Sequence, residues 1–101
     1  MSERLFLEAR HREAIKALLR EHLPGIEAWV YGSRINGRAH GGSDLDIALR
    51  SPNLAKIPAD KLASFEKALH DSSIPFLVEA RDWARLPENF HQEIERDHVV
   101  L

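Results

Sequence analysis

The sequence predicts an α/β domain in which a small mixed β-sheet has helices packed on one face. Three observations support this fold class. Apolar residues recur at helical spacing in three segments, and three others have the alternation or the β-branched and aromatic content of strands. These segments follow one another as helix, strand, strand, helix, strand and helix. The chain has 101 residues, the size of one ordinary domain, so we expect residues 1–101 to form a single domain.

Each predicted helix is marked by a residue that typically begins or ends one. The first helix covers about residues 8–23 and stops at Pro24-Gly25, because proline cannot continue a helix and glycine often follows the last turn. Pro58 can occupy the first position of the second helix, where its missing N–H costs nothing. Pro87 opens the third helix in the same way.

The predicted strands are short segments in which apolar residues alternate with polar ones or in which β-branched and aromatic residues gather. They cover residues 26–31, 45–49 and 74–80. The last residues, 99–101, are apolar, and they either cover the core or add a short edge strand. The segment between the first two strands, residues 32–42, contains four glycines and is too glycine-rich for a stable helix beyond one short turn.

Composition excludes several classes of protein. The formal net charge is −2, which argues against a protein that binds nucleic acid directly through a basic surface. Cysteine is absent, so neither a disulfide framework nor a thiolate metal site is expected. The N-terminus lacks the apolar segment of a signal peptide, and no stretch approaches the roughly 20 apolar residues of a membrane span. We therefore expect a soluble, cytoplasmic protein.

Asp44 and Asp46 are the first candidates for a functional site. Alternation in a strand places both carboxylates on one face, roughly 7 Å apart along the chain. Two carboxylates this close repel each other, and a hard divalent ion such as Mg²⁺, which prefers oxygen ligands, removes the repulsion. Alone, the pair is a weak signal, because two solvated aspartates on the exposed face of an edge strand have the same pattern.

Gly32 and Ser33 follow the first strand directly. Glycine lets the backbone approach a ligand closely, and consecutive N–H groups at a turn form an anion site. By itself this dipeptide also fits an ordinary turn. The joint pattern says more: strand, Gly-Ser, ten residues, Asp44-Leu45-Asp46, strand. It brings a phosphate cradle and a pair of metal ligands together, which is what phosphoryl or nucleotidyl transfer needs.

The segment WVYGSRINGRAHGGSDLDIAL resembles the signature of the DNA polymerase β-like nucleotidyltransferase superfamily. The short chain, the GSRxxG opening and the segment VEARDW look like its smallest members, the minimal nucleotidyltransferase (MNT) domains. The resemblance implies Mg²⁺-dependent transfer of AMP from ATP with release of pyrophosphate. It assigns the triphosphate to Gly32 and Ser33, and one or two Mg²⁺ ions to Asp44 and Asp46.

The family's third carboxylate falls at Glu79, which the resemblance makes a third metal ligand or the general base. Strand parity agrees, because Glu79 alternates with the apolar Val78 and Ala80. The family usually has aspartate here, so this glutamate is a departure that leaves full activity in doubt. Asp82 is an alternative, but its parity differs and it resembles a turn or helix cap.

Arg34 is a further candidate for binding the cofactor phosphates or the acceptor. The alternative is simple solvation or pairing with a carboxylate. Arg38, in the same loop, is a similar but less well placed candidate.

MNT proteins are typically paired with a helical HEPN-domain toxin. The resemblance therefore implies an antitoxin that modifies a tyrosine of such a partner with AMP and forms a hetero-oligomer with it. Two alternatives stay open: a partner that neutralises the toxin by binding alone, and a transferase for a small molecule such as an aminoglycoside.

Overall fold

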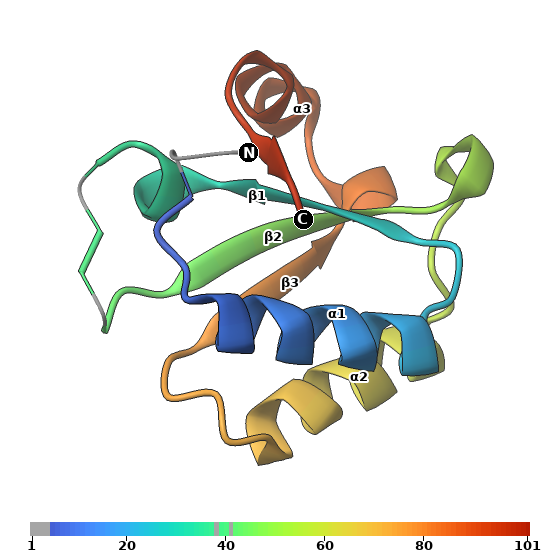
Figure 1. Ribbon diagram of the computed structural model, residues 1–101. Coiled ribbons are helices and arrows are strands. Elements are labelled where there is room, and N and C mark those ends of the chain that lie inside the picture. The colour runs from blue at the N-terminus through green and yellow to red at the C-terminus, as the bar shows by residue number, and fades with distance from the viewer. Residues whose placement is uncertain (1–4, 38, 41) are drawn as a thin grey trace.

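The structure, a computed structural model, describes residues 5–37, 39–40 and 42–101 (Figure 1). Within these residues the helices and strands are α1 (Ala9–His22), β1 (Glu27–Tyr31), β2 (Leu45–Arg50), α2 (Ala59–Asp71), β3 (Val78–Asp82), α3 (Glu88–Arg96) and β4 (Val99–Val100). Their order confirms the predicted α/β class, and the last apolar residues do form a short edge strand.

The strands form one mixed sheet in the order β3-β2-β1-β4. Strand β2 pairs antiparallel with β1 and parallel with β3, and β4 pairs antiparallel with β1. The parallel pair needs a crossover connection, and α2 provides it. Strand β2 therefore lies between β1 and β3, where its residues are flanked on both sides.

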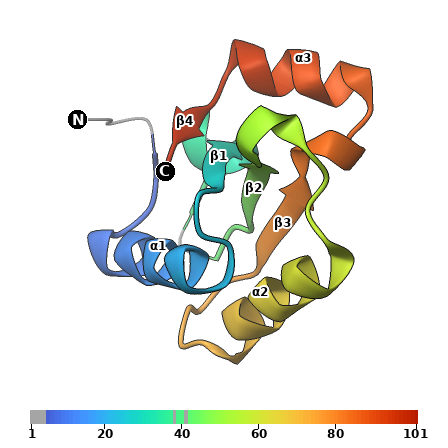
Figure 2. The same cartoon turned by 90° about the vertical axis from the view of Figure 1, so that its right-hand side faces the viewer.

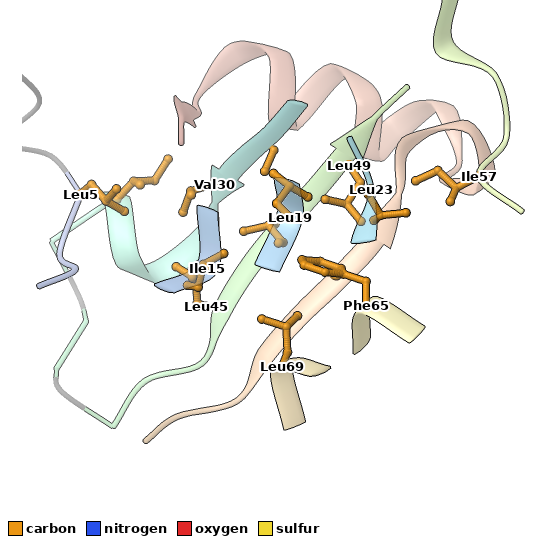
Figure 3. Close-up of a cluster of buried hydrophobic side chains, with 14 residues drawn as sticks. Leu5, Ile15, Leu19, Leu23, Val30, Leu45, Leu49, Ile57, Phe65 and Leu69 are labelled. Carbon is orange, nitrogen blue, oxygen red and sulfur yellow. The ribbon is translucent and has the colours of Figure 1, made fainter. Parts of the chain in front are cut away.

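Helices α1 and α2 cover one face of the sheet, as predicted (Figure 2). Figure 3 shows Ile15 and Leu19 of α1 and Phe65 and Leu69 of α2 packed with the apolar residues of the strands, among them Val30. Ile15, Phe65 and Val30 are fully buried. No helix in the described part of the chain is long and apolar enough to cross a membrane.

The sequence predicts that the helices pack on one face of the sheet, but helix α3 packs on the face opposite α1 and α2 (Figure 2). There Ile94 of α3 joins Ala48 and Trp83 in a second buried cluster. The guanidinium of Arg50 lies 3.9 Å from the ring centre of Trp29 and 4.7 Å from that of Trp83. This aromatic and cationic packing holds α3 over one part of the face that carries Asp46.

The alternation predicts a strand that begins at residue 74, but strand β3 begins at Val78. Pro75 has no N–H to donate to a ladder, which disfavours strand pairing at this position. Phe76 instead packs edge-on against His11 of α1, with ring centres 5.5 Å apart. The alternation of residues 74–77 therefore reflects packing beside the helices rather than a strand.

Candidate active site

Three side chains from three strands form a row across the face opposite α1 and α2. Tyr31 at the end of β1 pairs with Asp46 of β2, and Asp46 pairs with Glu79 of β3. Directly paired residues project to the same face of a sheet. Ile47 and Ala80, each one residue further along, are buried on the other face. The structure thus brings Asp46 and Glu79 together, with the parity that the alternation predicts.

Gly32 lies against the central carboxylate of this row. Its φ is +85°, a backbone conformation that side-chain-bearing residues rarely adopt. A Cβ at this position would lie 2.9 Å from Oδ2 of Asp46, closer than such atoms approach one another. Ser33 follows within the short 3₁₀ turn Gly32–Ile35. The Gly-Ser turn and Asp46 therefore lie next to each other, as the joint sequence pattern predicts.

Asp44 precedes β2 and is exposed to solvent, with the same parity as Asp46. Burial raises the pKa of Asp46, the neighbouring Glu79 raises it further, and Asp44 adds a smaller contribution in the same direction. Only Arg81 opposes these effects. Glu79 and Asp44 therefore both disfavour the charge on Asp46, and a bound cation would relieve this repulsion.

The binding of Mg²⁺ by Asp44, Asp46 and Glu79 stays a prediction from the sequence. Within the residues that the structure describes, no three His, Asp or Glu side chains lie close enough together to hold a metal ion. Glu79 is instead paired with Arg81, whose Nη2 lies 3.2 Å from its Oε1. The donor set still fits Mg²⁺, which takes a few carboxylate oxygens and completes its shell with water and phosphate. Asp44 and Asp46 are the side chains that would hold it.

Arg34 does not present its guanidinium to a phosphate, so the structure does not support the predicted contact. The side chain is 3% exposed. Its Nη1 donates to the carbonyl of Phe6 at 2.8 Å, and its Nη2 donates to the carbonyl of Ser43 at 2.6 Å. The guanidinium also lies 4.1 Å from the ring centre of Phe76. Arg34 thus ties the N-terminal segment to the loop that precedes Asp44.

Asp82 serves as a buried cap, in agreement with its parity. It accepts hydrogen bonds from the backbone N–H of Ile57 at 2.8 Å and of Ala84 at 3.1 Å, and it pairs with Arg85. It is therefore not available as the third carboxylate of the site. Arg38, the other loop candidate, lies outside the described residues.

Tyr31 and Arg81 are not among the candidates from the sequence, yet Tyr31 stands in the row and Arg81 lies beside it, paired with Glu79. Burial raises the pKa of the Tyr31 hydroxyl, Asp46 raises it further, and Arg81 opposes both through its charge and a hydrogen bond. The hydroxyl therefore stays neutral at physiological pH. The signal for Arg81 is its spacing of two from Glu79 on a strand, which places both on one face.

Comparison with known proteins matches residues 13–101 to a family described as polymerase beta, nucleotidyltransferase. A Haemophilus influenzae protein named "Probable protein adenylyltransferase MntA" is 31% identical over 99 residues. That similarity covers 96% of this chain and 83% of the relative. The matched range includes the Gly-Ser turn and the positions of all three carboxylates.

Proposed function

This chain belongs to the polymerase beta family of nucleotidyltransferases, and on that premise we propose that it transfers AMP from ATP to a hydroxyl of a partner protein. The observation that carries the proposal is the closeness of Gly32 to Asp46: a Cβ on Gly32 would lie 2.9 Å from Oδ2 of Asp46. The turn that we propose binds phosphate therefore lies against a carboxylate that we propose binds the metal. The name of the Haemophilus influenzae relative supports a protein as the acceptor.

Each residue of the site has a role in this reaction. The backbone of Gly32 and the hydroxyl of Ser33 bind the phosphates, and Asp44 and Asp46 hold Mg²⁺. When bound, this ion neutralises and orients the phosphate oxygens. The acceptor oxygen attacks the α-phosphorus of ATP, forming an O–P bond while the bond to the bridging oxygen of the β-phosphate breaks. Pyrophosphate leaves, and Glu79 takes the proton of the acceptor hydroxyl.

The partner we propose is a helical HEPN-type toxin, modified on a tyrosine, with which the chain forms a hetero-oligomer as an antitoxin. The resemblance to MNT domains and the relative named MntA support this partner class. The second candidate is neutralisation by binding alone. It is favoured by one specific observation, the ion pair of Glu79 with Arg81. The resemblance agrees, because it makes this glutamate a departure from the family's usual aspartate.

Co-expression with the product of the adjacent gene, followed by mass spectrometry, tests the proposal. Wild type should add AMP to a tyrosine of the partner, and the double variant Asp44→Asn, Asp46→Asn should not. A matched control is Asp60→Asn, Asp71→Asn, which removes two exposed carboxylates from α2. This control should modify the partner like wild type. If the Asp44, Asp46 double variant still protects cells fully, binding alone neutralises the partner and the proposed modification is wrong.

A further inference from the structure

The outer edge of β3 lies beside the carboxylates and has main-chain groups available for pairing. Strand β3 is an edge strand of the sheet, and β2 is its neighbour on the inner side. The N–H of Leu45 donates to the carbonyl of Leu77 at 2.9 Å, and Leu45 pairs with Val78. In a parallel ladder, alternate residues bond to the same neighbour. The main-chain groups of Glu79 therefore face β2, and those of Val78 and Ala80 face outward.

Among the described residues, no main-chain hydrogen bond engages the outward N–H and C=O groups of Val78 and Ala80. A hollow of about 290 Å³ lies along this edge, bordered by residues 77–81 and by Glu66 of α2. Leu77, at the start of the edge, is 56% exposed. An unpaired edge next to an exposed apolar side chain is the arrangement to which extended peptides add as an extra strand.

An added strand at this edge would extend the row of reactive side chains. A residue paired with Glu79 projects its side chain to the same face, from a backbone about 4.8 Å away. Asp46 lies on the other side of Glu79 in the same row. A hydroxyl residue at the paired position would thus stand next to the carboxylate that we propose as the proton acceptor.

We propose that the acceptor protein docks on the β3 edge as an extended segment, with its hydroxyl residue paired opposite Glu79. The main chain of Val78 and Ala80 supplies the hydrogen bonds, and Leu77 supplies an apolar contact. This inference rests on the proposed function and deepens it, because it names the conformation in which the acceptor is recognised. It predicts that the modified tyrosine lies in a segment that is extended, or becomes extended, in the complex.

The probe for the test is the capped peptide acetyl-Thr-Val-Tyr-Val-Thr-amide at millimolar concentration. Its twin replaces both valines by proline, which keeps the tyrosine but removes two main-chain donors. Binding is mapped by the amide NMR shifts of ¹⁵N-labelled protein saturated with Mg²⁺ and a non-hydrolysable ATP analogue. The valine peptide should shift the amides of Val78–Asp82 and slow their hydrogen exchange. The proline twin should do neither.

Three protein variants complete the test. Leu77→Asp should weaken the peptide about tenfold or more, because it removes an apolar contact. The matched control Val100→Asp alters the opposite edge, where Val100 is 45% exposed in β4, and should leave peptide binding unchanged. Ala80→Pro, which removes an outward N–H, should abolish binding if the variant folds.

The outcomes separate this inference from the proposed function. Binding of the ATP analogue, measured by calorimetry in the same samples, tests the nucleotide site without any acceptor. If the analogue binds while the peptide shifts other amides, or none, the edge is not the docking site and the inference is overturned. If the analogue itself fails to bind, the proposed function fails, whatever the edge does.

Discussion

Replacing Gly32 by alanine tests whether its contact with Asp46 organises the site. Two separate costs are expected. The first is backbone strain, about 1–2 kcal/mol for a side chain at a left-handed φ. For a domain of this size that corresponds to a fall in Tm of about 4–16 °C. The second is steric, because the new Cβ would lie 2.9 Å from Oδ2 of Asp46 and must push that carboxylate aside.

The chain supplies matched controls for the first cost. Gly25 and Gly37 both have φ of +83°, almost the +85° of Gly32, but a Cβ on either would meet nothing within 4 Å. Alanine at these two positions should therefore lower Tm by a similar amount without moving a carboxylate. Gly32→Ala alone should weaken Mg²⁺-dependent ATP binding, about 10–100-fold, the usual effect of disturbing the support of a metal ligand.

The assay is thermal unfolding of the three variants together with calorimetric titration of ATP in the presence and absence of Mg²⁺. Equal losses of Tm with a selective loss of ATP affinity in Gly32→Ala would confirm the reasoning. The reasoning is refuted if Gly32→Ala keeps wild-type affinity, since displacing Asp46 would then be harmless. It is also refuted if Gly25→Ala and Gly37→Ala lose as much affinity, because strain alone would then explain the effect.

Three further variants probe the carboxyl groups and the buried arginine. Asp46→Asn should stabilise the ligand-free protein at neutral pH, because the raised pKa of Asp46 means that its ionised form is disfavoured in the fold. This gain in the free energy of unfolding should disappear at about pH 3, below the ordinary aspartate pKa, because Asp46 is then mostly protonated in both folded and unfolded chains. Urea unfolding at neutral pH and at about pH 3 measures the difference. Asp82→Asn should lower the free energy of unfolding by about 1–3 kcal/mol through its weakened backbone hydrogen bonds, yet leave ATP binding by calorimetry unchanged. Arg34→Lys should cost a similar amount in urea unfolding, about 1–3 kcal/mol, because a lysine cannot bond both carbonyls and stack on Phe76.

The parts of the site that the sequence predicts are those fixed by alternation along a single strand. Asp46 faces away from the core because Ile47 faces into it, and the same parity places Glu79 opposite Ala80. The position of Gly32 follows in the same way, because a glycine with positive φ is needed where the backbone passes close to another group. These relations involve residues that are neighbours in sequence or lie on directly paired strands, so local sequence patterns are enough to predict them.

The parts that the sequence did not predict depend on contacts between distant segments. Arg34 bonds to the carbonyl of Phe6, which is 28 positions away, and no periodicity indicates that direction. Helix α3 has an apolar stripe like the other helices, and its choice of face depends on meeting Trp83 and Ala48 across the sheet.

The charges around Asp46 explain why this residue affects both the stability of the ligand-free protein and the proposed binding of ligands. Its carboxylate is partly buried and has Glu79 and Asp44 as neighbours of like charge, so its pKa is raised and its ionisation is less favourable than in the unfolded chain. Arg81 opposes this only in part, and a cation between the carboxylates would remove the remainder. Because Gly32 has no side chain, the same carboxylate also lies in contact distance of the turn that we propose binds phosphate. A ligand that combines a divalent ion with a phosphate chain therefore satisfies both features at once, whereas either component alone would leave one of them unmet.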